Sequence, residues 1–195
     1  TLPAASPSPD ATTATLTEIQ TQSVQPQPSV PRLLLTCGTG SAGQLGMKGV
    51  GNVLEMTGTS TDLLHHNDDN ELLSLSVSAL HTLLVRTDGV VYTSGNNEFG
   101  QLGRSGQSGK VLRPLESLTQ RIVEVCAGER FSFARSESGR LFSWGINNFG
   151  QLGHGHRNSP VLKPRPVKNI RGNLPVRKVA CGKEHVLAVC NGGEL

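Results

Sequence analysis

A glycine-rich motif that occurs three times limits what this chain can fold into more than any other feature. Each copy contains the tetrapeptide Gly-Gln-Leu-Gly, with a further glycine five positions before it. The copies start at Gly38, Gly95 and Gly145, so the steps are 95 − 38 = 57 and 145 − 95 = 50 residues. Self-similarity at a period of about fifty residues is typical of propellers, solenoids and arrays. We expect structural roles for the recurring residues, which are Gly38, Gly43, Gln44, Leu45 and Gly46, then Gly95, Gly100, Gln101, Leu102 and Gly103, then Gly145, Gly150, Gln151, Leu152 and Gly153.

A strand–turn–strand pattern precedes the second and third copies and begins again near the end of the chain. Asp-Gly, Ser-Gly and Asn-Gly separate short apolar runs, and such pairs favour hairpins because glycine accepts the positive φ of the turn. A further short strand ending in small residues lies upstream. One unit is therefore predicted to be a strand, a small-residue corner, a hairpin, a glycine-rich loop and a connection. The predicted strands are 33–37, 81–86, 90–94, 122–128, 131–135, 140–144, 176–182 and 185–190.

Two histidines, His81 and His185, occupy the same place in their units. A side chain that recurs in this way is expected to have a structural role, such as a hydrogen bond to a neighbouring loop. The three leucines of the tetrapeptide are expected to fill the gap between adjacent sheets. Phe99 and Phe149 are expected to wedge beside them.

The chain divides by composition into residues 1–31 and residues 32–195. The first segment is rich in Pro, Ser, Thr, Ala and Gln, has few charges, and is predicted to be a disordered linker, with a short recognition segment around Pro26-Gln27-Pro28 as the alternative. The repeats are assigned to about 32–103, 104–153 and 154–195, continuing past the end of the chain. No apolar run reaches the eighteen or so residues of a membrane span.

Several local patterns resemble chemical sites but do not carry the required context. Residues 38–43 match G-x-G-x-x-G, yet the following glycines oppose the helix that a dinucleotide site needs. Residues 103–111 fail the phosphate-loop pattern, and His65-His66 and His154/His156 lack a set of metal ligands. The four cysteines form no C-x-x-C pair and are expected to be inert buried thiols in a reducing compartment. We therefore predict no catalytic residue, cofactor, metal site or small-molecule substrate.

A basic run between residues 157 and 178 contains no acidic residue. An ordinary solvated edge is the favoured interpretation, and a patch that docks phosphates or acidic protein surfaces is the alternative. The formal net charge of the chain is only +3, which is too mild to indicate nucleic acid by itself. The candidate docking residues are Arg157, Lys163, Arg165, Lys168 and Arg171.

The units resemble the repeats of the regulator of chromosome condensation family over about residues 32–195. The features that match are the Gly-x-Asn-x-Phe-Gly-Gln-Leu-Gly motif, the sequence Ala-Cys-Gly-Lys-Glu-His ending at His185, and the glycine at the hairpin turn. The departures are Cys37 for the aromatic residue, Ala42 for Phe, Ser78 for Gly and Phe131 for His.

The resemblance implies an all-β chain that forms part of a seven-bladed β-propeller. The 195 − 31 = 164 repeat-bearing residues account for about three blades, so we expect a fragment of a larger propeller. For function, the resemblance implies a protein–protein interaction module that serves as a scaffold or regulatory domain of a larger protein. The alternative is a guanine-nucleotide exchange factor for a Ran-type small GTPase, with chromatin association. The expected location is intracellular, either cytoplasmic or nuclear.

Overall fold

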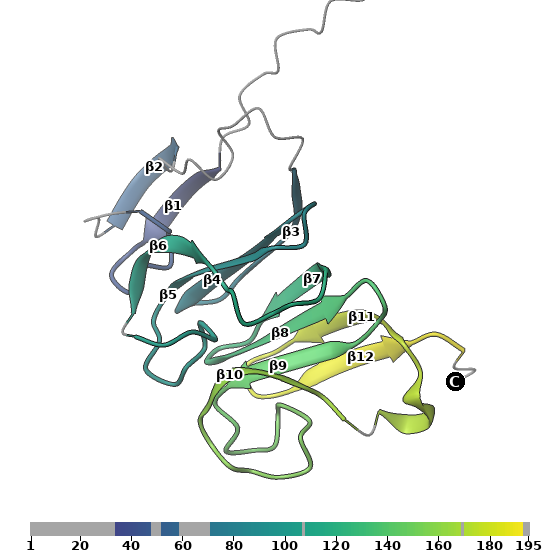
Figure 1. The fold of residues 1–195 in the computed structure, drawn as a ribbon. Helices are drawn as coiled ribbons and strands as arrows, with labels where there is room; N and C mark the ends of the chain where they lie inside the picture. Colours follow the sequence, from purple (N-terminus) through teal and green to yellow (C-terminus); the bar gives the residue numbers. More distant parts are fainter. Residues whose placement is uncertain (1–33, 48–51, 59–70, 107, 169, 193–195) are drawn as a thin grey trace, which may run out of the picture. The chain divides into compact units, whose positions relative to one another are not determined.

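A computed structural model describes residues 34–47, 52–58, 71–106, 108–168 and 170–192, and these residues form an all-β structure (Figure 1). The predicted fold class is therefore confirmed. Among the described residues no helix has the length and hydropathy to cross a bilayer. The elements are β1 (Leu35–Thr39), β2 (Asn52–Gly58), β3 (Leu72–Val77), β4 (His81–Arg86), β5 (Val91–Gly95), β6 (Gly109–Pro114), β7 (Ile122–Ala127), β8 (Phe131–Ser136), β9 (Leu141–Gly145), β10 (Val161–Pro166), the 3-10 helix η1 (Arg171–Asn173), β11 (Val176–Cys181) and β12 (Val186–Cys190).

The strands pair in chain order as antiparallel meanders. Strands β3 to β6 form one four-stranded sheet and β7 to β10 form another, while β1–β2 and β11–β12 are two-stranded. The predicted hairpins are present: His81 lies opposite Gly95 in the β4–β5 pair, and Phe131 lies opposite Gly145 in the β8–β9 pair. Gly89 at the first hairpin turn has a φ of 84°, as expected for such turns.

The outer strands β6 and β10 lie inside segments that the sequence suggests are connections. Each sheet therefore continues past its glycine-rich loop and ends at Pro114 or Pro166 rather than at the loop. Proline is tolerated there because an edge strand leaves backbone N–H groups outside the ladder. The proline content and the register shifts in both pairs explain why the alternation of the sequence does not reveal these strands.

The second strand of each four-stranded sheet is buried on both faces. In β4, Leu83 and Val85 belong to the main hydrophobic cluster shared with the β7–β10 sheet, whereas Leu84 joins Tyr92 and Leu112 in a separate cluster. Alternate residues of a strand point to opposite faces, so the sheet has apolar neighbours on both sides. Sheets of this kind cannot be stable alone and are covered by stacking successive units.

Direct hydrogen bonds connect the first strands of neighbouring sheets. The amides of Val125 and Ala127 in β7 donate to the hydroxyls of Ser74 and Ser76 in β3, at 3.3 and 3.0 Å. These amides lie on the edge strand of their sheet and would otherwise lack partners. The serine hydroxyls thus provide hydrogen-bond acceptors for the edge amides of β7, and they fix the spacing of the two sheets.

Two expectations lie outside the described residues. They are the disordered segment at 1–31 and the polar loop around His65-His66.

Candidate functional site

The three glycine-rich loops have the same backbone conformation. Their first glycines, Gly38, Gly95 and Gly145, have φ values between 100° and 115°. A Cβ on Gly95 would lie 2.4 Å from the carbonyl oxygen of Leu80, and one on Gly145 would lie 2.5 Å from that of Arg130. In the second and third copies glycine is needed because the backbone passes close against the preceding strand, whereas at Gly38 only the positive φ favours it.

The glutamine of each tetrapeptide closes its own loop. Its Oε1 accepts a hydrogen bond of 3.0 Å from the amide two residues earlier, for Gln44, Gln101 and Gln151 alike. Such side-chain to backbone bonds hold a turn that has no ladder of its own. The recurrence of glutamine is explained by this local bond.

An asparagine braces the second and third loops. Asn97 Oδ1 accepts from the amide of Leu102 at 3.0 Å, and Asn147 Oδ1 accepts from that of Leu152 at 3.1 Å. Each amide group also donates across the loop, Asn97 to the carbonyl of Gly106 at 2.7 Å. The first copy has Gly40 at this position and lacks the brace.

The carbonyl of the tetrapeptide glutamine connects one unit to the next. The hydroxyl of Thr82 donates to the Gln44 carbonyl at 2.6 Å, and that of Ser132 donates to the Gln101 carbonyl at 2.8 Å. Trp144 Nε1 donates to the same Gln101 oxygen at 2.8 Å. Leu102, which follows Gln101 in the chain, is fully buried, as is Leu152 in the third loop. The loops are therefore the seams between sheets.

His81 belongs to this seam and is fully buried. Its Nε2 lies 2.8 Å from Ser132 Oγ in the next sheet, and its Nδ1 lies 2.9 Å from Ser78 Oγ. Because Ser132 gives its proton to the Gln101 carbonyl, it accepts from Nε2–H, and Nδ1 accepts from Ser78. Burial lowers the pKa of His81 to about 4, so the imidazole is neutral at pH 7.

His185 has a different environment from His81. It is exposed, and its ring lies over Gly182, where a Cβ would be 2.3 Å from the ring. The equivalent Phe131 packs over Gly128 in the same way. The local sequence does not indicate the whole environment of His81, because one of its two ring hydrogen bonds involves a serine fifty-one residues away.

The expected wedge of Phe149 beside the leucine is wrong. Phe149 is 62 % exposed, whereas Phe99 is half-buried beneath the guanidinium of Arg130, which lies 5.2 Å from its ring centroid. The residue aligned with Arg130 in the following unit is Glu184, which cannot provide a cation–π contact.

One loop position keeps its contact while its side chain changes. The residue after the tetrapeptide is Met47, Arg104 or His154. Each contacts a hydroxyl on a neighbouring strand: Thr36 at 3.3 Å from Met47 Sδ, Thr93 at 3.2 Å from Arg104 Nε, and Ser143 at 3.2 Å from His154 Nε2. A constant scaffold therefore presents a thioether, a guanidinium and an imidazole at equivalent places.

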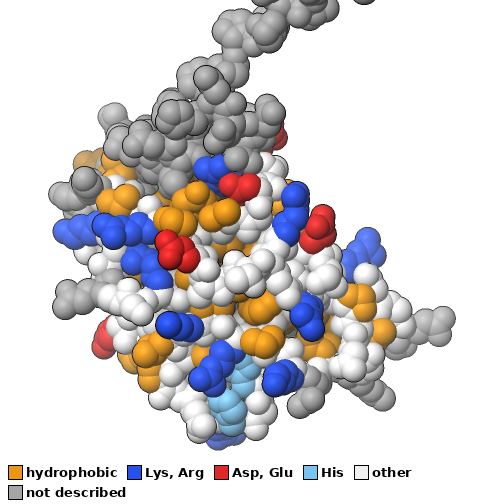
Figure 2. Space-filling model, in the orientation of Figure 1, with side chains coloured by type: hydrophobic (Ala, Val, Ile, Leu, Met, Phe, Trp, Pro, Cys, Tyr) orange, Lys and Arg blue, Asp and Glu red, His pale blue; other side chains and the backbone are white. Residues whose placement is uncertain are grey.

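The candidate basic residues lie along one stretch of chain. Lys163 and Arg165 are on β10, with Arg157 before the strand and Lys168 after it, and all are exposed. None of these forms an ion pair with a described carboxylate. Arg171 starts η1. Figure 2 shows Lys and Arg side chains spread over the described part of one face, with fewer acidic ones among them.

Cys37 differs in exposure from the other three cysteines, and the described histidines are spread along the chain from His81 to His185. In the described ranges no group of three or more His, Cys, Asp or Glu side chains could hold an ion. All four cysteines are free, and Cys37 is exposed, so the expectation that it is buried is wrong. A hydrogen bond to Cys126 and burial raise the pKa of Cys181, which keeps that thiol protonated.

Comparisons with known proteins give one consistent family. The model of the regulator of chromosome condensation (RCC1) repeat matches residues 88–135 and 138–189, just over half of the 195 residues. A second model of the same description matches residues 73–101 and 122–151.

Individual relatives agree with the family models. The chain is 31% identical over 167 residues to the regulator of chromosome condensation of Mus musculus, covering 85% of this chain and 38% of that protein. It is 34% identical to the protein named "Probable E3 ubiquitin-protein ligase HERC6" of Homo sapiens, over 64% of this chain and 12% of that one. The chain therefore spans well under half the length of these relatives.

A solved structure supports the fold. Prp20p of Saccharomyces cerevisiae, described with its binding properties to Gsp1p and histones, matches with a TM-score of 0.70 and 19% identity, over 80% of this chain and 39% of that chain. At this identity the likeness concerns the fold alone.

Proposed function

Because the chain belongs to the regulator of chromosome condensation (RCC1) repeat family, we propose that its β-sheet units act as a protein-binding module of a larger β-propeller protein. The match to HERC6 over 12% of that protein is consistent with a module carried by different larger chains. Fold alone does not assign function, so the proposal rests on how the loops are built.

The observation that carries this proposal is a difference between the two ends of each sheet, although the loops at one end also join neighbouring sheets. At one end the hairpin turns serve the structure: the carbonyls of Gly89 and Gly139 accept from the amides of Ile122 and Val176 in the next unit. At the other end the loops keep one backbone framework while the side chain after the tetrapeptide varies. Variable side chains on a rigid framework are typical of binding surfaces in repeat proteins.

The test uses the full chain as bait, with charge-changing substitutions at the two ends of the sheets. Glu98→Lys and Asn148→Lys change exposed loop residues, and Arg140→Glu changes an exposed residue next to a hairpin turn. We expect the loop variants to lose captured protein partners and the turn variant to keep them. Equal retention by all three variants would refute the assignment of the loop end as the binding surface.

A second candidate function is nucleotide exchange on a Ran-type small GTPase. It is favoured by the match to the mouse regulator over most of this chain and by the Gsp1p binding named for Prp20p. No exchange residue can be assigned to a position of this chain. The assay is release of a fluorescent GDP analogue from a panel of small GTPases, and an unchanged rate with the full-length protein would remove this candidate.

The proposal includes an intracellular location, cytoplasmic or nuclear, and docking to acidic surfaces such as chromatin. The free thiols are consistent with a reducing compartment. The exposed cations of β10, which pair with no carboxylate among the described residues, are consistent with an acidic partner.

A further inference from the structure

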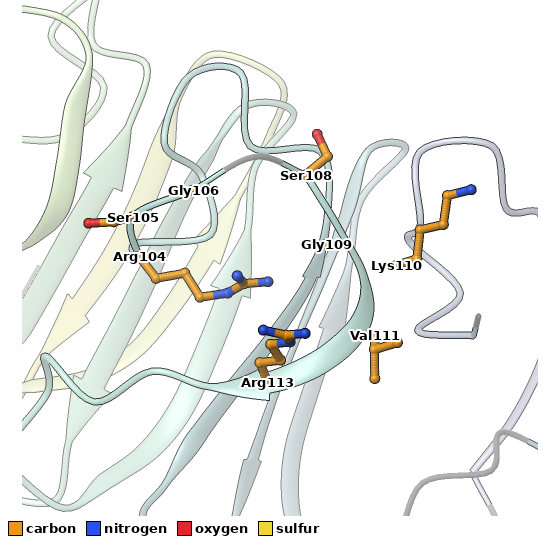
Figure 3. A pocket seen from close by; sticks show the side chains of 8 residues that line it. All are labelled: Arg104, Ser105, Gly106, Ser108, Gly109, Lys110, Val111 and Arg113. Carbon is orange, nitrogen blue, oxygen red and sulfur yellow. The ribbon is translucent and has the colours of Figure 1, made fainter. Parts of the chain in front are cut away.

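A charged hollow of about 400 Å³ lies between the loop after Gly103 and strand β6. The described residues that line it run from Arg104 to Arg113, and none of them is acidic. Figure 3 shows the guanidinium groups of Arg104 and Arg113 facing one another, while Lys110 points away from both. The centre of the hollow is therefore a pair of guanidinium groups, with a third cation nearby.

The positive charge of this hollow has no counter-charge within the described residues. Neither Arg104, Lys110 nor Arg113 forms an ion pair there. Burial and the repulsion of Arg113 lower the pKa of Arg104, and Arg104 Nη2 is enclosed without a hydrogen-bond partner. Two like charges held together without an anion cost free energy that a bound anion would recover.

The pair is held in place by the sheet. Arg104 Nε donates to Thr93 Oγ1 at 3.2 Å, and Arg113 lies directly opposite Thr93 in the β5–β6 register. A Cβ on Gly109 would lie 2.3 Å from Arg104 Nη2, so the guanidinium occupies the space that a side chain would take. The Arg104 guanidinium is therefore positioned by a hydroxyl and a glycine, and the strand register places Arg113 beside it.

From these observations we propose that the hollow binds a phosphate monoester. Guanidinium groups bind phosphate through paired N–H donors, and two of them match a group with several acceptor oxygens. A phosphate monoester carries about −1.5 to −2 charges at pH 7 and neutralises this pair more fully than one carboxylate. The monoester can belong to a phosphorylated protein side chain or to a small free molecule, and the chemistry recognised is the same.

Nucleic acid fits the hollow less well. Its phosphates are diesters with one negative charge each, spread along a backbone, whereas this site is a single compact hollow. No aromatic side chain lines it to stack a base.

The proposal is tested by following backbone amide resonances of the full chain during titration. The probes are inorganic phosphate, a phosphoserine peptide and the same peptide with glutamate in place of phosphoserine. We expect saturable shifts at Gly106, Ser108 and Gly109 with the two phosphate probes. Arg113→Gln should weaken binding about tenfold. Arg104→Lys, which keeps the positive charge but loses the paired N–H donors of the guanidinium group, should weaken binding by several fold. Arg140→Gln, at an exposed arginine on another sheet, should leave it unchanged.

Three results would overturn the proposal. They are the absence of saturable shifts at tens of millimolar phosphate, equal affinity for the glutamate peptide, and tighter binding of a short DNA duplex than of the phosphopeptide. If the phosphoserine peptide binds more tightly than inorganic phosphate, the natural ligand is a phosphorylated protein. Equal affinities for these two probes indicate a small free phosphate ester. The site goes beyond the proposed protein-binding function: saturable phosphate binding together with equal partner capture by the loop and turn variants would contradict only that function.

Discussion

Acidification should destabilise the seam between the β3–β6 sheet and the β7–β10 sheet through one side chain, His81. The side chain is fully buried, and its pKa is lowered to about 4 from an ordinary value of 6.5. Between these two values the unfolded chain binds a proton that the folded chain does not bind. Stability therefore rises with pH across this window and is lost as pH falls from 6.5 towards 4.

The magnitude follows from the separation of the two pKa values. A difference of 6.5 − 4 = 2.5 pH units corresponds to about 3 kcal/mol for the whole window, and to about 2 kcal/mol between pH 6.5 and pH 5. Protonation would also turn Nδ1 from an acceptor into a donor, so the hydroxyl of Ser78 could no longer donate to it and would have to reorient. Since folded domains have about 5–15 kcal/mol in total, this loss is easy to detect.

The assay is urea unfolding of the full chain at pH 7 and pH 5, followed by the fluorescence of Trp144. This is the only tryptophan, and it donates to the same carbonyl as Ser132, so it reports on the seam that contains His81. The control is His81→Gln, which has polar groups but does not titrate. The wild-type chain should lose about 2 kcal/mol more than the variant between the two pH values. An equal loss in both proteins would refute the reasoning.

Three further predictions test other contacts. Glu124→Gln weakens the contacts of 2.7 Å to Arg135 and Lys178 and should lower the free energy of unfolding in urea by about 2 kcal/mol. In the control Glu129→Gln, the contact with Lys183 is 3.8 Å and the loss should be less than about 1 kcal/mol. Gly145→Ala should cost about 3 kcal/mol more than Gly150→Ala, because both have positive φ but only the first places a Cβ against backbone; similar thermal midpoints would contradict this. Binding to nucleosomes or acidic peptides should weaken steeply with salt and with charge reversal of the exposed residues Lys163, Arg165 and Lys168. An unchanged affinity would remove the docking proposal.

The inner strands and hairpins are predictable from sequence because their signals are local. Gly89 and Gly139 mark turns between apolar runs, and β4 starts and ends where the sequence predicts. The outer strands β6 and β10 are not predictable in this way. Their pairing depends on a neighbour already in place, and their prolines suggest a loop when they are read alone.

The loop contacts are predictable only in part. The repetition of Gln44, Gln101 and Gln151 indicates a structural role, but not that each bonds an amide two residues earlier. The pair of Arg104 and Arg113 has no local signal. These residues lie nine positions apart and face one another only because strand register places Arg113 opposite Thr93.

The Gln101 carbonyl accepts from two side chains of the following sheet, and this has a consequence for how such chains can be recombined. The acceptor and its donors are encoded more than thirty residues apart, in different repeats. In the last repeat, Val186 occupies the position equivalent to Thr82 and Ser132, and its side chain has no hydroxyl. If the order of the repeats were changed, the side chains that donate to the Gln101 carbonyl would no longer lie beside it. The segment that can be exchanged intact between such chains is therefore the boundary between two sheets, and not a single sheet.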